Sequence, residues 1–362
     1  MSTKIATPAG CEPALKDKKS LQLQAIPKVS REITCQILRQ EEYPEWDNLI
    51  DRSPNGTIFH YSWWLQTTSA DFTILAIRNE RGVIVAGMPI PFERRHGLKL
   101  FRSPRLTPYL GPVFDVSNID NTCDRLHFMR TNGELLARNI KSYDCVRYVA
   151  GACAPDLQGF LWAGFRVNLA YTFRFPSTHT LDQITAGMTR THLQKLTKAM
   201  RLNLTVVRDE GVEDLVLLYR KTFEKQGLKP TCSEDFLRRL WNEAHSQERA
   251  HLYIAKTQDE KPVAALLTVH DNRTTYQIVS GVNPDFREIP GAYLILWKAM
   301  QDTLLAGRDY DFEGSGLRGV ECFYRRWGAS AVPIWRLEKS GSWRGGFFHT
   351  LVERRDFKRV NK

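Results

Sequence analysis

The sequence predicts an α/β fold made of two similar units in tandem, each a mixed sheet flanked by helices. Residues 72–95, FTILAIRNERGVIVAGMPIPFERR, have the alternation of two strands joined by a turn at 79–82. Residues 251–278, HLYIAKTQDEKPVAALLTVHDNRTTYQI, repeat that pattern with a turn at 258–261 and add a third strand after a turn at 271–273. Both hairpins are followed by a loop, a helix and another strand. A repeat of this length is too long for a solenoid unit and indicates a duplicated domain, chance similarity of two hairpins being the alternative.

The helix and strand after each hairpin are predicted at matching places. The first half has a helix at 121–141 and a strand at 143–150, whereas the second half has a helix at 291–306 and a strand that begins with DYDF at 309–312. The pairs Tyr143-Asp144 and Tyr310-Asp311 are expected at corresponding points. These matches extend the predicted duplication beyond the hairpins.

Two helices are predicted between the halves. In THLQKLTKAMR, residues 191–201, Leu193, Leu196 and Met200 recur at helical spacing, and the other face is basic (His192, Lys195, Lys198 and Arg201). This basic face suits either a solvated surface or an RNA contact. The second helix, 233–249, begins with a predicted capping serine, Ser233.

Composition bounds the class of protein. The chain has 362 residues, of which 42% are hydrophobic and 25% charged, which is enough for two globular domains of ordinary size. We expect an N-terminal arm without fixed structure (1–30), a first domain (31–175), a second domain (176–340) and a basic C-terminal tail (341–362). The net charge of +11 favours an anionic partner.

Cysteine and histidine usage indicates no disulfide framework and no metal. The seven cysteines are scattered without a C-x-x-C, and the nine histidines show no ligand spacing. Because neither a signal peptide nor a membrane span is evident, we expect a cytoplasmic protein.

The segment at 309–316, DYDFEGSG, places Glu313 where a strand opens into a glycine-rich turn. Its flanking Phe312 and Gly314 would leave the carboxyl partly desolvated and raise its pKa. Three roles remain open: a structural acceptor, an ion-pair partner for the nearby arginines, and a general base.

With these pieces in place, the chain resembles the duplicated GNAT-like acyltransferases, the group that includes Fem-type aminoacyltransferases and polysaccharide-cluster acetyltransferases. The resemblance covers residues 57–337 and rests on TIFHYSWWLQ (57–66), TPYLGPVF (107–114), THLQKLTKAMRLNLTVV (191–207), PGAYLILWKAM (290–300) and DFEGSGLRGVECFYRRWGA (311–329). It implies two tandem GNAT-like domains with the substrate cleft near their junction.

The donor site is expected where a helix opens at Pro290 and Gly291. Free backbone amides of Gly291 and Ala292 would meet a phosphate there, and Arg287 could add charge. The spacing from Arg287 is one residue longer than in the usual GNAT cofactor loop, so an ordinary helix start is the alternative.

Catalytic candidates follow from the needs of acyl transfer. Glu313 would accept the amine proton, Tyr293 and Tyr276 would act as acids or orienting hydroxyls unless they are core residues, and the amides at Ser315 could hold an oxyanion.

Substrate contacts are predicted in the first half and after Glu313. Trp63 and the rigid turn with Tyr109 and Gly111 would line the cleft, while Arg325 and Arg326 would pair with Glu313 or reach phosphate. The lysine with which Fem-type enzymes hold a phosphorylated acceptor is missing from HYSWWLQTTSA.

The predicted function is therefore N-acetyl transfer from acetyl-CoA, a phosphorylated donor, to an amino sugar or other amine, without a metal. One alternative is an aminoacyl-tRNA-dependent transfer to a peptide or cell-wall precursor, with tRNA as partner. The other is a non-catalytic scaffold that binds nucleic acid or another anion.

Overall fold

The first half of the chain forms five strands of a mixed sheet, a short side strand and a strand that leaves it. The computed structural model describes residues 34–69, 71–314, 318–347 and 350, and the predicted N-terminal arm lies outside them. We call residues 34–175 the first half and 176–340 the second half. The first half contains β1 (Cys35–Ile37), η1 (Gln40–Glu42), α1 (Tyr43–Arg52), η2 (Ile58–His60), α2 (Ser62–Thr68), β2 (Asp71–Arg78), β3 (Ile84–Arg95), β4 (Leu98–Arg102), β5 (Val113–Phe114), α3 (Thr122–Asn139), β6 (Cys145–Ala150), α4 (Gln158–Trp162) and β7 (Arg166–Phe175).

The second half repeats this order after two linking helices. It contains α5 (Leu181–Gly187), α6 (Arg190–Arg201), β8 (Thr205–Arg208), α7 (Val212–Lys225), α8 (Glu234–Ser246), β9 (Ala250–Lys256), β10 (Pro262–His270), β11 (Thr274–Val282), η3 (Pro284–Phe286), α9 (Gly291–Leu305), β12 (Asp309–Asp311), α10 (Arg318–Arg326) and β13 (Ser330–Ser340). The predicted hairpins, helices and following strands are all present, so the predicted duplication and its α/β class are confirmed. Asp311 lies inside β12 whereas Asp144 precedes β6, so the two Tyr-Asp pairs are offset.

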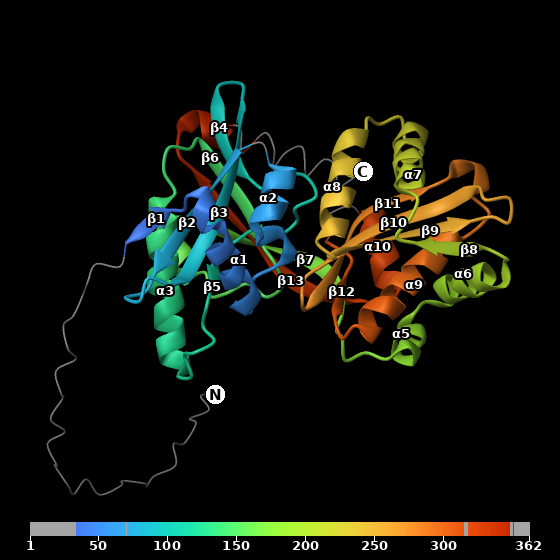
Figure 1. The fold of residues 1–362 in the computed structure, drawn as a ribbon, viewed down its shortest axis with the longest axis horizontal. Helices are drawn as coiled ribbons and strands as arrows, with labels where there is room; N and C mark the ends of the chain where they lie inside the picture. Colours follow the sequence, from blue (N-terminus) through green and yellow to red (C-terminus); the bar gives the residue numbers. More distant parts are fainter. Residues whose placement is uncertain (1–33, 70, 315–317, 348–349, 351–362) are drawn as a thin grey trace, which may run out of the picture. The chain divides into compact units, whose positions relative to one another are not determined.

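The last strand of each half pairs with the sheet of the other half. The strand order is β1-β2-β3-β4-β6-β13-β7-β12-β11-β10-β9-β8, with β5 on β3. Consequently β7 pairs with β12 and β13 pairs with β6, and Figure 1 shows both strands between the two groups of sheet strands. The pairs β4–β6 and β11–β12 are parallel and the others are antiparallel, which makes the sheet mixed.

Two hydrophobic cores lie on opposite faces of the second-half sheet. Leu252 and Ile254 of β9 belong to a large core that also contains Trp46 and Trp64 of the first half, whereas Ala255 faces a smaller core under α9. This alternation is what a strand with two buried faces produces. Because the larger core draws on both halves, neither half buries its apolar surface alone.

Local signals define several helix ends as predicted. The Ser233 side chain accepts a hydrogen bond from the backbone NH of Phe236 and caps α8, and α9 begins at Gly291 directly after Pro290. The prediction for α6 was wrong in detail: His192, Leu196 and Ala199 form its buried stripe, while Leu193 and Met200 are exposed. A neutral imidazole among aromatic rings is apolar enough to replace the expected leucine.

Candidate active site

A buried carboxylate at the end of β12 organises the junction of the two halves. Asp311 is fully buried, and it pairs with Arg174 of β7, its Oδ2 lying 3.1 Å from the arginine Nε. Thr172 Oγ1 donates a hydrogen bond to Asp311 Oδ1 at 2.6 Å, and Tyr109 of the first half donates at 3.2 Å. Burial raises the pKa of Asp311, while the charge of Arg174 opposes the rise. Asp311 is thus a satisfied structural anion that ties Tyr109 to the second half.

Glu313 is the unsatisfied acid of this junction. Its backbone NH donates to Asp311 Oδ1 at 2.8 Å, and its φ of 56° lies in the left-handed region that few side chains adopt. Its Oε1 is buried and has no hydrogen-bond partner among the described residues. Burial first, and the charge of Asp311 second, raise the pKa of Glu313 well above its usual range. A carboxyl in this environment favours its protonated form more than an exposed glutamate does.

Neither of the predicted arginine partners pairs with Glu313 in the described part of the chain. Arg325 pairs with Glu321 on the same helix at 2.8 Å, and within the described residues Arg326 makes no ion pair with Glu313. Glu321 lies one turn before Arg325 on α10, whereas Glu313 precedes the helix, so Glu321 is the partner within reach. Of the three roles left open by the sequence, the ion pair is absent from the described contacts.

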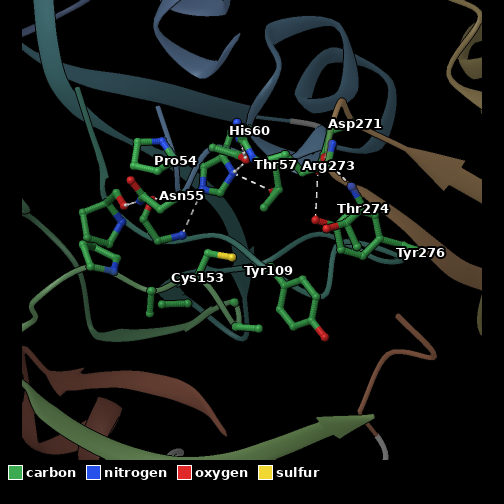
Figure 2. A pocket seen from close by; sticks show the side chains of 18 of the residues that line it. Pro54, Asn55, Thr57, His60, Tyr109, Cys153, Asp271, Arg273, Thr274 and Tyr276 are labelled. Atoms are coloured by element: carbon green, nitrogen blue, oxygen red, sulfur yellow. Dashed lines mark hydrogen bonds between the residues drawn. The ribbon is translucent and has the colours of Figure 1, made fainter. Parts of the chain in front are cut away.

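Tyr109 and Tyr276 bring the two halves together at a small cavity. Their ring centroids are 5.9 Å apart, and the Tyr276 hydroxyl donates to Asp271 Oδ2 at 2.9 Å. Burial raises the pKa of both phenols. The cavity measures about 20 Å³, enough for about one water molecule, and Figure 2 shows both tyrosines, His60 and Asp271 around it. The predicted Gly111 lines the same cavity.

His60 fixes the first-half wall of this cavity as a neutral ring. The backbone NH of Thr57 donates to its Nδ1 at 3.2 Å, which leaves Nε2 to donate to the carbonyl of Gly111 at 3.2 Å. Burial lowers the pKa of His60 to about 4. The imidazole therefore stays uncharged at neutral pH and holds the turn that carries Tyr109.

The strand β11 has an open edge next to Glu313. It pairs with β12 only over Thr274–Tyr276, and no described strand pairs with that side from Gln277 to Val282. Ile278 is an extra residue in the ladder with β10, and such a bulge bends a strand away from its neighbour. The open edge runs from the end of β12 toward the loop that precedes α9.

The start of α9 differs from the expected phosphate loop in two ways. Gly291 is buried, and a Cβ at this position would lie 2.8 Å from Cγ1 of Val263, so packing explains the glycine. Arg287 is exposed and lies 3.5 Å from its neighbour Glu288. Pro290 caps the helix and Ala292 is half-buried in its first turn. Positive charge near this helix start comes from α6, whose Lys198 donates to the carbonyl of Glu288 at 3.0 Å.

The other predicted residues occupy different surroundings. Tyr293 packs among His192, Phe323 and Trp327, with ring centroids 5.1, 5.6 and 5.6 Å away, and among the described residues it contacts neither Asp311 nor Glu313. Trp63 is half-buried on α2 beside Trp64. Ser315 and residues 351–362 of the predicted basic tail lie outside the described residues.

Sequence reasoning missed the residues that hold the site together. Arg174 and Thr172 lie in the buried C-terminal end of β7, Asp271 lies in a hairpin turn, and Tyr324 of α10 has its pKa raised by burial and by Glu313. A charged residue inside the apolar run FRF was the available signal for Arg174. Its partner could not be named because β7 pairs with a strand more than 100 residues later in the chain.

The equivalent opening in the first half is filled by the chain itself. Beyond Arg102 of β4, the segment 107–112 lies beside β6, and the backbone NH of Leu110 donates to the carbonyl of Val149 at 2.6 Å. Gly111 fits there because a Cβ would lie 3.0 Å from Cβ of Ala150. The open strand edge is therefore a feature of the second half.

In the described residues, no group of three or more His, Cys, Asp or Glu side chains is arranged to hold a metal ion. None of the described helices is both long and apolar enough to cross a bilayer.

Comparison with known proteins agrees with this architecture. Residues 186–325 match the family described as the acetyltransferase (GNAT) domain. No curated protein matches the sequence. Among solved structures, FemX has a TM-score of 0.63 at 15% identity, covering 84% of this chain and 97% of that one. The C-terminal domain of a putative lysylphosphatidylglycerol synthetase from Agrobacterium fabrum has a TM-score of 0.51 at 12% identity, covering 83% and 92%.

A tandem GNAT protein from the clavulanic acid biosynthesis pathway has a TM-score of 0.50 at 10% identity, covering 86% of this chain and 99% of its own. It shares the duplication that the strand order shows. Residues 186–325 are therefore similar to a GNAT acetyltransferase domain, and the chain as a whole shares the fold of these structures.

Proposed function

We propose that this chain is an acyltransferase that moves an acyl group, acetyl from acetyl-CoA, to the nitrogen of an amino sugar or another amine. The observation that carries the proposal is the open edge of β11, which begins beside Glu313 and leads toward the start of α9. An extended ligand with amide groups can pair with such an edge as an added strand. The pantetheine arm of CoA has this chemistry.

The phosphates of the donor belong at the start of α9. The first backbone amides of a helix and its dipole favour an anion, and Ala292 lies in this first turn. Lys195 and Lys198 of α6 lie beside α9: the Nζ of Lys195 is 5.4 Å from the Tyr293 ring centroid. These lysines, rather than Arg287, are the charges we assign to the donor.

Glu313 is proposed as the general base. As the amine nitrogen attacks the thioester carbonyl, it forms the new N–C bond, the C–S bond breaks and the nitrogen loses a proton to the Glu313 carboxylate. The proton ends on the released thiol of CoA. Asp311 and Tyr109 are assigned as positioning residues, because Asp311 accepts a hydrogen bond from the backbone NH of Glu313 and Tyr109 donates one to Asp311.

Binding and turnover test the two parts of this proposal separately. Glu313→Gln should still bind acetyl-CoA in a calorimetric titration but lose about 10²- to 10⁴-fold in turnover with an amine panel, since that is the usual contribution of a general base. Glutamate is a favourable residue in the first turn of a helix, so Ala292→Glu should leave α9 intact. Its negative charge should nevertheless weaken acetyl-CoA binding by repelling phosphate. Full binding by Ala292→Glu, or unchanged turnover by Glu313→Gln, would refute the corresponding part.

Aminoacyl-tRNA is a second candidate donor, favoured by the exposed basic face of α6 next to the start of α9. Residues Lys195 and Arg201 on this face are exposed. Binding of bulk aminoacyl-tRNA that weakens steeply between about 50 and 200 mM salt, with no signal for CoA, would favour this donor. A CoA signal with no tRNA binding at the lower salt concentration would exclude it.

A further inference from the structure

A second pocket lies in the first half, apart from the cavity at the junction. It measures about 340 Å³, within the usual size of small-molecule sites. It opens where β4, β6 and β13 adjoin, and its lining combines arginines with an apolar wall (Leu100, Phe101, Arg102, Ser103, Thr107, Pro108, Cys145, Arg147, Val149 and Arg336). Nothing in the proposed transfer chemistry uses this pocket.

The charge in this pocket is unbalanced. Its described lining contains three arginines and no acid. Arg102 pairs with Glu93 at 2.7 Å, and Arg147 pairs with the buried Glu338 at 3.1 Å. Arg336 is half-buried, and its side chain makes no ion pair or hydrogen bond within the described part of the chain. A partly desolvated guanidinium without a counter-ion favours an oxyanion, which it can bind through two parallel hydrogen bonds.

Strand pairing places this pocket on the same sheet face as the proposed catalytic site. On β7, Arg174 is opposite Asp311 of β12 and Asn168 is opposite Arg336 of β13. Arg336 is in turn opposite Val149 of β6. Residues opposite one another share a face, and residues an even number apart on β7 do too. Thr172, which bonds to Asp311, and Asn168 are four residues apart, about 13 Å along the strand.

The segment 107–112 links the two sites. Thr107 and Pro108 line the arginine pocket, whereas Tyr109 and Gly111 line the junction cavity. A ligand in the pocket therefore contacts Thr107 and Pro108. The next residue, Tyr109, donates a hydrogen bond from its hydroxyl to Asp311.

We infer that the pocket anchors the acyl acceptor: the acceptor is an amine that carries an oxyanion, phosphoryl or carboxylate, on the order of 10 Å from its nucleophilic nitrogen, and Arg336 binds that oxyanion. This inference rests on the proposed acyl transfer for the identity of the ligand as acceptor. The pocket itself is independent of the donor, because the open edge of β11 and the start of α9 contribute none of its lining.

The first experiment measures anion binding to the full-length protein without any donor. Inorganic pyrophosphate and citrate are titrated calorimetrically into the wild type, Arg336→Gln, Arg336→Lys and a matched control, Arg81→Gln, which removes an exposed charge in the turn at 79–82. We expect at least one probe to bind the wild type and Arg81→Gln alike, at least tenfold more weakly to Arg336→Gln, and at an intermediate strength to Arg336→Lys. Equal binding by all four proteins, or no binding of either probe to the wild type, would overturn the inference.

The second experiment separates the phosphoryl and carboxylate classes through acetyl transfer to aminohexyl phosphate, aminohexanoate and the neutral aminohexanol. The wild type should show a KM at least tenfold lower for one charged amine than for aminohexanol, and Arg336→Gln should lose that preference with kcat little changed. Equal KM values for all three amines in the wild type would overturn the acceptor role. If no amine is acetylated, the proposed function fails, whereas the anion titration still decides whether Arg336 forms an oxyanion site.

Discussion

At the scale of single residues, the site contains two acids with opposite surroundings. Asp311 has an arginine, a threonine, a tyrosine and a backbone NH around it, whereas Glu313 has a buried oxygen without a partner. Pairs of titratable groups whose environments separate their pKa values are typical of acid–base sites. The strain of a left-handed glutamate is tolerated because Asp311 holds its NH and Gly314 packs directly on the carbonyl of Tyr171.

The raised pKa of Glu313 predicts a specific pH dependence of stability. Between the ordinary pKa of 4.5 and the raised folded value, the native state binds more protons than the unfolded state, so the free energy of unfolding falls as pH rises. Glu313→Gln removes this dependence. Urea unfolding at a series of pH values should therefore show the variant gaining stability relative to wild type as pH increases through that window. A constant difference across the series would contradict the raised pKa.

At the scale of elements, the bulge in β11 and the start of α9 act together. The pairing with β12 ends at Tyr276, opposite Asp311, and the bulge at Ile278 in the ladder with β10 follows on the unpaired part of β11. Gly291 contributes by close packing: its Cα faces Val263 of β10 and Ala255 of β9. The sequence predicted the helix start correctly, but it could not show which side of Gly291 is crowded.

Gly291→Ala should destabilise the fold although alanine favours helices. The new Cβ would meet Cγ1 of Val263 at 2.8 Å, and overpacking of this kind costs roughly 1–3 kcal/mol. Adding Val263→Ala removes the clash, so the double variant should lose less stability than the sum of the two single variants. Thermal and urea unfolding of the four proteins measure this, and strictly additive effects would exclude the clash.

Helix α6 shows where periodicity fails. The spacing of Leu193, Leu196 and Met200 indicated a buried stripe, yet the helix is rotated so that His192 is buried and Leu193 is 40% exposed. The imidazole packs against Tyr293, Phe323 and Trp327, which come from α9 and from the α10 region. Sequence patterns assign a histidine to the polar face of a helix. Only the tertiary contacts show that the His192 ring packs in the core as an apolar side chain would.

At the scale of the whole molecule, the halves are joined by a shared core and by backbone contacts. Phe59 of the first half and Tyr276 of the second half have ring centroids 4.8 Å apart. Arg273 Nη2 donates to the carbonyls of Ser53 and Gly56 at 2.8 and 2.7 Å. These contacts explain why the described residues of the two halves form one compact unit.

Arg273→Ala should lower the stability of both halves together. It leaves two part-buried carbonyls without their donor, a loss of about 1–3 kcal/mol, whereas Arg220→Ala on the exposed face of α7 should cost no more than about 0.5 kcal/mol. Urea unfolding followed by tryptophan fluorescence should show a single transition in each case. Two separate transitions in the wild type would contradict the shared core.

The sequence made the duplication and most elements predictable because each hairpin carries its own alternation. It could not show that β7 pairs with β12 of the second half and β13 with β6 of the first half, since an alternating strand such as RVNLAYTFRF suits either sheet. Tyr109, Tyr276 and Glu313 were named from local signals, but their meeting depends on this exchange. Asp311 and Arg174 were missed for the same reason.

The exchanged strands also constrain synthesis on the ribosome. The N-terminal half lacks the neighbour of β6 until residues 330–340 have emerged, and until then β6 offers an unpaired edge. The nascent chain must therefore keep its first 300 or so residues from pairing with other chains while the last strand is still in the exit tunnel. A message that ends before Ser330 would yield a protein with two open sheets, not one finished domain and one missing domain.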